Sequence, residues 1–490
     1  MLLQTAASEA LLETGRAQIL DFRLGEAEES FKALARTSDG GAAAYMHLAT
    51  VAVMKLIITD EERYYASFFA WSDSLKRELA DAPASKWRAY LGAEAHLQRA
   101  LVRAKQHSYL KAALAGRAAY RAFDRTLEAY PEFYEAYKGM GLLHLAIGAL
   151  PTTYRQFLEM MGYEGGTKMG LDELRLAATQ SRFNREEALV YLALADVMLF
   201  GSQGDGRDIL ASLYQTHPES PLFAYLHGYI LLSNREAEAA EAVLGIAADV
   251  GPGYFPVDYA AYYLGEALFR QNRFAEAELR FRHYLTQHKG DALKALANLR
   301  LGQSLEMQGQ YAEARRFYKE VRAKREFDSD AVAAREARRR VRAPMGVYER
   351  QLLFCRNAFD RAAYEEAEAR IMAATEIADA ASPSQRAEVA YHLGRTYHAS
   401  GRLDEALVQY QYVLDHPGDK KAHWAPWSQF YVGEIHLQRG HRQAATVAFE
   451  AALAFKGEFD FYQTLEQNSR AALERLQATP AQPIGTTAAQ

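Results

Sequence analysis

Cysteine, proline and long uncharged runs are scarce in this sequence. A single cysteine, Cys355, excludes an internal disulfide bond and leaves the cellular compartment open. The 490 residues include only 13 prolines and 32 glycines, which favours long helices over a loop-rich β fold. No stretch reaches the roughly 18 uncharged apolar residues that span a bilayer, so we expect no membrane span.

Two further absences concern location and partners. The start, MLLQTAASEALLETG, lacks the charged-then-apolar build of a signal peptide, which predicts a cytoplasmic protein. A secreted or periplasmic chain that begins after a removed signal would look the same. The formal net charge of −5 argues against nucleic acid as a partner, because nucleic-acid binding calls for a concentrated basic face.

Patterns for metal binding and catalysis are also absent. No two of the 14 histidines lie four residues apart, and the sequence has no HExxH or CxxC. Lys168 follows glycines in GYEGGTKMG, but a phosphate-binding loop needs GKS or GKT leading from a strand into a helix. We therefore predict no catalytic residue, no metal site and no cofactor, and a protein that is not an enzyme.

A recurring glycine is the strongest regularity that is present. An alanine follows it twelve residues later, and a large apolar residue follows four residues after the alanine. The copies are Gly15, Ala27 and Phe31; Gly228, Ala240 and Leu244; Gly265, Ala277 and Phe281; Gly302, Ala314 and Tyr318; Gly394, Ala406 and Tyr410; Gly433, Ala445 and Phe449. A degenerate copy has Cys355, Ala367 and Ile371 in the same positions.

This pattern is the signature of tetratricopeptide helix pairs. We expect the glycine and the alanine to lie where the two helices of a pair cross, and the large residue to fill the gap to the next pair. Such repeats stack on their nearest neighbours. The sequence therefore predicts an all-α fold, a right-handed α-solenoid of tetratricopeptide-like helix pairs.

The regularity of the pattern divides the chain. Residues 1–215 are helical but irregular, and they include a distinctive segment over 139–178. Residues 216–475 carry the regular repeats, with an insertion near 325–347 where one step between repeats is longer than the others. Residues 476–490 have no periodicity and are predicted to form a disordered tail.

The segment from Gly139 to Ala178 carries a family resemblance. A glycine-containing helix runs into a Leu-Pro pair, and a short amphipathic helix, an aromatic-glycine turn and a Gly-Leu pair follow. The residues in these positions are Gly141, Leu150, Pro151, Leu158, Gly162, Tyr163, Gly165, Gly170, Leu171 and Leu174. The segment resembles the motif of the tetratricopeptide repeat protein 39 family, which also contains the fungal inclusion-body clearance proteins.

The resemblance covers roughly residues 8–475 and departs from the family at Gly165-Gly166, where the family has Gly-Asp. It implies a non-enzymatic adaptor, linked in eukaryotes to lipid handling or to clearance of aggregated protein. Arginine outnumbers lysine, which is typical of a GC-rich bacterial genome. In a bacterial member, only the fold and a general role as an adaptor would be expected to be shared with the eukaryotic proteins.

Partner-binding residues are expected on the first helix of each pair, three residues before the glycine and one residue after it. These concave-face positions hold Tyr225, Tyr229, Tyr262, Glu266, Gln303, Arg356, Tyr391, Arg395, Phe430 and Glu434, together with Leu299 and Leu352. The first position of each pair is apolar and the second is usually polar. Domains that clamp chaperone tails use lysine and asparagine there, so chaperone tails are not the predicted partner.

An apolar stripe edged by mixed charge suits a hydrophobic or amphipathic peptide. We therefore predict a protein-interaction scaffold with a protein or peptide partner. The alternative is a carrier that encloses a lipid or another small apolar ligand. The insertion near 325–347 is a candidate to fill part of the groove from within.

A basic cluster, AREARRRVRA, lies in that insertion. On a helix, Arg335, Arg338, Arg339 and Arg342 fall on one face, where they could bind an acidic partner or remain a solvated surface.

Overall fold

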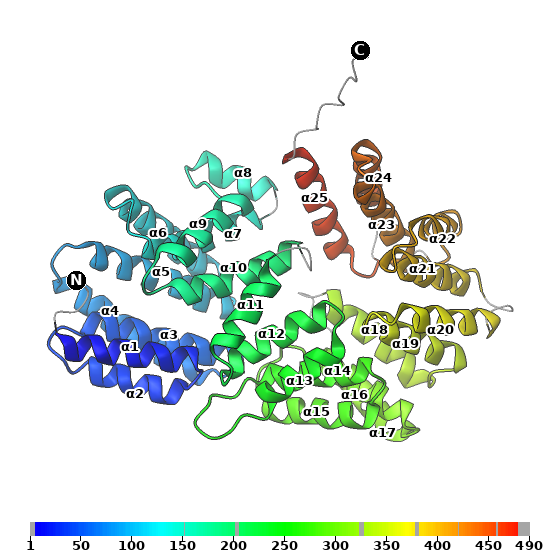
Figure 1. Ribbon diagram of the computed structural model, residues 1–490, viewed down its shortest axis with the longest axis horizontal. Coiled ribbons are helices and arrows are strands. Elements are labelled where there is room, and N and C mark those ends of the chain that lie inside the picture. The colour runs from blue at the N-terminus through cyan, green and yellow to red at the C-terminus, as the bar shows by residue number, and fades with distance from the viewer. Residues whose placement is uncertain are drawn as a thin grey trace, which may run out of the picture. The chain divides into compact units, whose positions relative to one another are not determined.

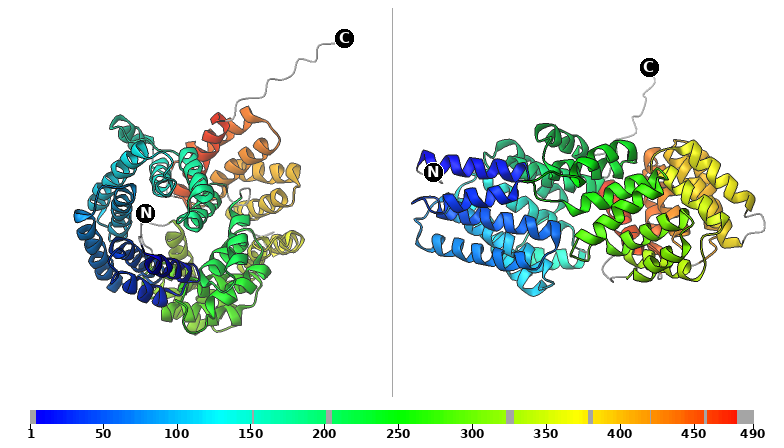
Figure 2. Two further views of the ribbon diagram at one scale, coloured as in Figure 1. Left: turned by 60° about the vertical axis from the view of Figure 1, so that its left-hand side comes forward. Right: turned by 90° about the horizontal axis from the view of Figure 1, so that it is seen from below.

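The computed structural model describes residues 5–150, 152–200, 205–322, 328–377, 382–419, 421–456 and 459–478. These residues form 25 helices and no strand, which confirms the predicted all-α fold. Successive helices pack as hairpins joined by short turns, and the hairpins stack side by side (Figure 1, Figure 2). This is the architecture that the glycine–alanine pattern predicts.

The chain divides into two compact units, each with its own stack of hairpins. Unit 1 comprises Met1–Asn234, Ala239–Leu264 and Thr286–Asp291, and thus continues past residue 215, where the sequence pattern changes. Its helices are α1 (Ala6–Leu20), α2 (Leu24–Leu34), α3 (Gly41–Thr59), α4 (Arg63–Asp81), α5 (Lys86–Lys105), α6 (Tyr109–Ala129), α7 (Glu135–Gly148), α8 (Thr152–Met160), α9 (Thr167–Gln180), α10 (Arg185–Phe200), α11 (Gly206–Thr216), α12 (Pro221–Ser233), most of α13 (Ala237–Ala248) and the first half of α14 (Asp258–Arg270).

Unit 2 comprises Arg235–Glu238, Gly265–Leu285 and Ala292–Gln490. Its helices after α14 are α15 (Phe274–Gln287), α16 (Lys294–Met307), α17 (Tyr311–Glu320), α18 (Asp328–Arg342), α19 (Val347–Phe359), α20 (Tyr364–Ile377), α21 (Pro383–Ala399), α22 (Leu403–Asp415), α23 (Trp424–Gln438), α24 (Arg442–Ala454) and α25 (Tyr462–Ala478). The last helix reaches three residues into the predicted tail, and residues 479–490 lie outside the described residues.

The repeated glycine lies against the large residue of its own pair. A Cβ added at Gly302 would lie 2.5 Å from Cε1 of Tyr318, and one at Gly265 would lie 2.8 Å from Cε1 of Phe281. The same contact joins the other regular copies, namely Gly15 with Phe31, Gly228 with Leu244, Gly394 with Tyr410 and Gly433 with Phe449. The large residue also reaches the next pair, as expected, since Phe31 stacks on His47 of α3 and Tyr410 stacks on Tyr431 of α23. Its side chain covers the glycine, because only a missing side chain lets the two helices approach there.

In the distinctive segment over 139–178, glycines likewise allow two helices, α7 and α9, to pack closely against each other. A Cβ added at Gly141 would lie 2.9 Å from the carbonyl oxygen of Gly170, and one added at Gly170 would lie 2.7 Å from the carbonyl oxygen of Gly141. The two backbones thus touch, which no other residue type would permit. Leu171 and Leu174 are buried beneath this contact. Pro151, the proline of the Leu-Pro pair, lies outside the described residues.

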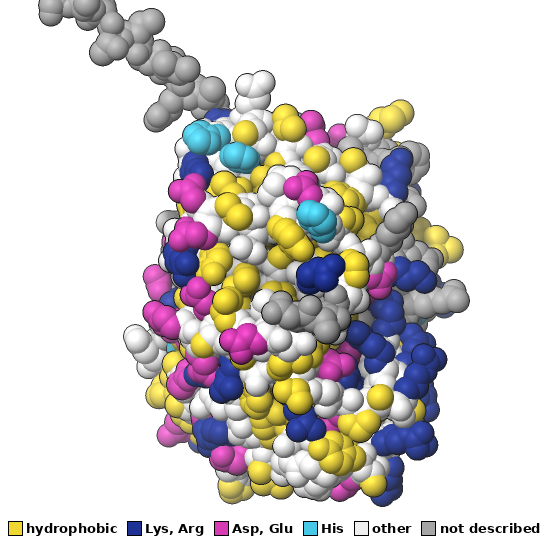
Figure 3. Space-filling model, turned by 90° about the vertical axis from the view of Figure 1, so that its right-hand side faces the viewer, with side chains coloured by type: hydrophobic (Ala, Val, Ile, Leu, Met, Phe, Trp, Pro, Cys, Tyr) yellow, Lys and Arg dark blue, Asp and Glu magenta, His cyan; other side chains and the backbone are white. Residues whose placement is uncertain are grey.

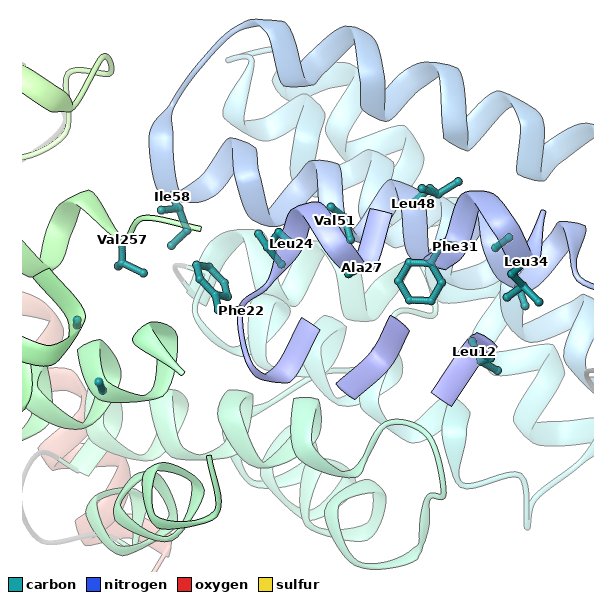
Figure 4. Close-up of a cluster of buried hydrophobic side chains, with 14 of the residues drawn as sticks. Leu12, Phe22, Leu24, Ala27, Phe31, Leu34, Leu48, Val51, Ile58 and Val257 are labelled. Atoms are coloured by element: carbon teal, nitrogen blue, oxygen red, sulfur yellow. The ribbon is translucent and has the colours of Figure 1, made fainter. Parts of the chain in front are cut away.

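The core at the start of unit 1 joins segments far apart in the chain. Leu12 of α1, Phe31 of α2 and Leu48 of α3 are buried together (Figure 4). Val257, just before α14, belongs to the same cluster. The backbone N–H of Phe255 also donates to the carbonyl of Phe22 at 2.9 Å. The last helices of unit 1 therefore return to its first turn.

One helix of unit 1 is long and apolar enough to cross a membrane. The 19 residues of α3 include a window with mean hydropathy of 1.6, so the expectation of no membrane span is not confirmed on length and composition. In the structure 56% of that window is buried. Lys55, inside this helix, pairs with Glu28 at 2.7 Å. The sequence criterion did not select α3, because Lys55 interrupts its uncharged run.

Candidate functional site

The insertion of unit 2 contacts parts of that unit that lie far apart in the chain. The insertion forms α18, which packs on α16 and α17 and also contacts α25. Arg335 of α18 forms an ion pair with Asp460, just before α25. Three helix pairs, α19 to α24, separate α18 from α25 along the chain, so the contact between α18 and α25 brings the two ends of this stretch together. Whether the insertion fills part of the groove stays a prediction.

Unit 1, by contrast, encloses a cavity of about 550 Å³. Its walls come from α1, α3, α5, α7, α10, α12 and the start of α14. Most of the lining is apolar, for example Val53, Leu97, Val190, Leu194 and Leu222. The volume lies within the range of about 300–1,000 Å³ that is usual for small-molecule sites.

Apolar side chains also mark where the cavity reaches solvent. Ile57 of α3 and Leu101 of α5 both line it, yet they are 39% and 45% exposed. Exposure of large aliphatic side chains to water is unfavourable, with a free energy roughly proportional to the exposed apolar area. An apolar molecule that enters beside them would cover that area.

The lining of the cavity includes an ionic triad in which the lysine and one of the two carboxylates are buried. Nζ of Lys138 on α7 lies 3.2 Å from a carboxylate oxygen of Glu94 on α5 and 3.1 Å from one of Glu187 on α10. The side chains of Lys138 and Glu94 are only 3% and 2% exposed. Burial raises the pKa of Glu94, against the opposing charge of Lys138. Burial alone would lower the pKa of Lys138, but Glu187 and Glu94 raise it well above its ordinary range. The ammonium is therefore charged at neutral pH.

A histidine that also lines the cavity is uncharged. Burial lowers the pKa of His47 on α3 to about 3, and its ring stacks on Phe31 at 4.8 Å between centroids. Arg16, on the opposite helix α1, donates to the carbonyl of Phe183 at 2.5 Å and lies 4.0 Å from Glu186. The cationic groups of the lining are thus already engaged by groups of the protein.

Of the concave-face residues expected in this region, Tyr225 lines the cavity. Tyr229 packs edge-on against Tyr263 at 5.0 Å, and Tyr262 is buried. The cavity also takes in Tyr259, which the spacing rule did not select. Lys138 was missed as well, although a lysine within the apolar run KGMGLLHLAIG is a signal that could have been followed.

Two expected groove residues of unit 2 bond to a neighbouring arginine instead. Arg300 of α16 donates to both carboxylate oxygens of Glu266, at 2.6 and 3.3 Å, and to Oε1 of Gln303 at 3.1 Å. Both acceptors are buried. The arginine lies two residues before the repeat glycine, so it belongs to the same inner surface.

The remaining expected residues lie on successive helices of unit 2. Arg356 is exposed, whereas Arg395 is half-buried with its guanidinium 4.2 Å from the ring centroid of Phe359. Tyr391 and Phe430 are buried. Glu434 is half-buried, and burial raises its pKa. Whether these residues touch a partner stays a prediction.

The four arginines of the basic cluster, Arg335, Arg338, Arg339 and Arg342, are all exposed on α18. Arg339 pairs with Glu336 at 2.8 Å, and Arg340 of the same run is buried and pairs with Glu336 at 2.7 Å. The face of the molecule in Figure 3 mixes acidic, basic and apolar side chains, with basic side chains gathered along one edge.

Cys355 lies in the glycine position of its repeat, as the spacing predicts. It is buried in a cluster with Ile371 and Ala367, and burial raises the pKa of its thiol to about 12. A thiol that ionises so reluctantly is a packing residue rather than a nucleophile.

Comparisons with known proteins agree with this architecture. Residues 93–249 match the family Iml2/Tetratricopeptide repeat protein 39, and residues 296–325 match a tetratricopeptide repeat model. The chain is thus a tetratricopeptide-type repeat protein, and the resemblance predicted from the Leu-Pro segment is confirmed over residues 93–249. The matched segment contributes α7, α10 and α12 to the cavity wall, together with the part of α5 from Ala93 onward.

Solved structures show similarity at low sequence identity. A tetratricopeptide repeat protein from Parabacteroides merdae is 13% identical with a TM-score of 0.29, over 66% of this chain and 96% of that one. Yeast Tom70 is 13% identical with a TM-score of 0.34, over 96% of this chain and 82% of that one. No curated protein sequence matches the chain. The repeat fold is consistent with a protein-interaction scaffold.

Proposed function

We propose that unit 1 is a non-catalytic carrier that holds a small, largely apolar molecule in its inner cavity. The observation that supports this most is the cavity itself, about 550 Å³ of space with mostly apolar walls and apolar side chains at its mouth. Removing apolar surface from water stabilises such a complex by about 25 cal/mol per Å².

The size of the cavity separates this proposal from peptide binding. An α-helix with its side chains is about 10–12 Å wide and rises about 5.4 Å per turn, so one turn occupies roughly 420–610 Å³. One turn is thus comparable in volume to the cavity, and the remaining turns of an amphipathic helix would lie outside its mouth. A compact molecule fits this volume better than a helical partner segment does.

A neutral, environment-sensitive dye such as Nile red tests the proposal. We expect it to bind purified protein with one site per chain and a blue-shifted emission. Leu194→Trp places a large ring in the cavity and should weaken binding at least about tenfold, which corresponds to about 1.4 kcal/mol.

Leu279→Trp is the matched control, because Leu279 is a leucine on α15 that is 65% exposed and does not line the cavity. Circular dichroism should show that both variants are folded. If folded Leu194→Trp binds the dye as tightly as the unmodified protein, the cavity is not the binding site.

The second candidate is a protein partner that inserts one or two apolar anchor side chains into the cavity. It is favoured by the repeat fold and by the exposed apolar mouth at Ile57 and Leu101. Native mass spectrometry separates the two candidates. A carrier purified with its ligand shows an additional small-molecule mass, which a peptide-anchoring scaffold lacks.

A further inference from the structure

Arg395 on α21 is half-buried and yet has no anionic partner. Within the described residues its guanidinium forms no ion pair and donates no hydrogen bond. It lies instead beside two aromatic rings, 4.2 Å from the ring centroid of Phe359 and 5.9 Å from that of Tyr391. A ring attracts the positive charge but offers no carboxylate oxygen, so the N–H donors of the guanidinium stay available. A charge that is partly withdrawn from water without an anion is suited to receive one from a ligand.

A second arginine without an ion pair occupies the equivalent position of the preceding repeat. Arg356 follows Cys355 on α19 as Arg395 follows Gly394 on α21, and equivalent positions of stacked repeats face the same side. Arg356 is exposed and forms no ion pair with a described residue. Both arginines act on one histidine, because burial, Arg395 and Arg356 together lower the pKa of His423 to about 3. The two positive charges therefore lie near each other.

The carboxylates around these arginines do not neutralise them. Glu336 pairs with two arginines of its own helix, and Glu388 accepts a hydrogen bond from a tyrosine hydroxyl at 3.1 Å. Asp360 acts on Arg395 only from beyond ion-pair distance. Arg235, a third cation of unit 2, lies 4.2 Å from the same phenylalanine ring that Arg395 contacts. This face of unit 2 therefore carries an excess of positive charge.

A flexible acidic peptide suits this arrangement better than a membrane or a nucleic acid does. A flat lipid surface does not reach a half-buried arginine, and nucleic-acid binding calls for a larger basic face. A peptide can present one carboxylate to each of two successive repeats, with the paired N–H···O bonds that arginine and carboxylate form. Its apolar side chains can pack on the aromatic rings beside Arg395.

We infer that unit 2 binds an acidic segment of a partner protein, whose aspartate or glutamate side chains accept hydrogen bonds from Arg395 and Arg356. Both arginines belong to unit 2, so this inference does not depend on the carrier function proposed for unit 1.

Three probes test the inference on the full chain by fluorescence anisotropy. The first is an amidated, rhodamine-labelled peptide of glutamate, leucine and serine. The second is the same peptide with glutamine in place of glutamate, and the third is an oligothymidylate of equal charge. We expect the glutamate peptide to bind at least about tenfold more tightly than the glutamine peptide, since a charge-assisted hydrogen bond has about that effect. Added salt should weaken the binding of the glutamate peptide.

Two variants assign this preference to the two arginines. Arg395→Met should weaken binding of the glutamate peptide at least about tenfold, and Arg356→Met about threefold, because the exposed arginine is better hydrated. Arg316→Met is the matched control and should leave binding unchanged. Arg316 is exposed on α17 and forms no ion pair in the described part of the chain, so the control removes the same charge elsewhere in unit 2.

Circular dichroism shows which variants are folded. Because Arg356 is exposed, Arg356→Met keeps the inference testable even if Arg395→Met does not fold. Equal binding of the glutamate and glutamine peptides overturns the inference, and so does binding to folded Arg356→Met that is as tight as binding to Arg316→Met. Tighter binding of the oligothymidylate that is lost in the two arginine variants would assign this face to nucleic acid and would also overturn it.

Discussion

Gly302→Leu is expected to lower the free energy of unfolding of the repeat region by about 3 kcal/mol or more. A Cβ at this position would lie 2.5 Å from the ring of Tyr318, and the rest of the leucine has no space beyond it. Overpacking of this kind costs about 1–3 kcal/mol. The displaced ring would also lose the hydrogen bond that the Tyr318 hydroxyl donates to Glu306 at 2.6 Å, which adds roughly 1.5–3 kcal/mol because the acceptor is charged.

Gly25→Leu is the matched control for Gly302→Leu, since both replace a helical glycine with leucine. Gly25 lies on α2, is exposed, and has no atom within 4 Å of an added Cβ. Leucine is a better helix former than glycine, so this variant should be neutral or slightly stabilising. Urea denaturation followed by circular dichroism measures both. Equal midpoints for the two variants would mean that glycine and tyrosine are not in contact across the pair.

Lys138→Met is expected to destabilise unit 1 by about 3–5 kcal/mol. Removing one partner from a buried ion pair leaves the other charge without compensation, and here Glu94 is 2% exposed. Adding Glu94→Leu to Lys138→Met should recover most of the loss, because a buried ion pair replaced by apolar residues of similar size is often neutral. Glu187 is 41% exposed and can stay hydrated in the double variant.

The pH dependence provides an internal check on the Lys138→Met variant. Burial raises the pKa of Glu94 already in the native protein, and loss of the ammonium removes the opposing charge. A carboxyl whose folded pKa is raised stabilises the fold below its unfolded pKa and loses that contribution as the pH rises through the folded value. The melting temperature of Lys138→Met, relative to the unmodified protein, should therefore recover on mild acidification. If the melting temperature of Lys138→Met lies equally far below that of the unmodified protein at neutral and at mildly acidic pH, the loss of stability does not come from an unpaired charge on Glu94.

The sequence predicts the repeat but not the cavity, and the reason is the range of the contacts. Gly302 and Tyr318 are close in the chain and belong to one hairpin, so their spacing alone indicates that they pack together. Lys138 and Glu94 are 44 residues apart and meet only after several hairpins have stacked. The cavity extends from Arg16 to Tyr259, so no local pattern records it.

The expected groove residues show the same limit. Tyr225 lines the cavity, as its position on a first helix indicates. Glu266 and Gln303 occupy equivalent positions, but Arg300 from the same surface bonds to both. The spacing identifies which residues point inward. It does not identify which of them are already bonded to another side chain.

The most direct measurement of the central claim is photolabelling. A long-chain alcohol with a diazirine in its alkyl part is bound to the purified protein, irradiated, and located by mass spectrometry of proteolytic peptides. Labels are predicted on the cavity walls of α3 and α10, near Val53, Met54, Val190 and Leu194. Labels confined to exposed apolar residues outside the cavity, such as Leu110 and Leu114 of α6, with those walls unlabelled, would contradict the account.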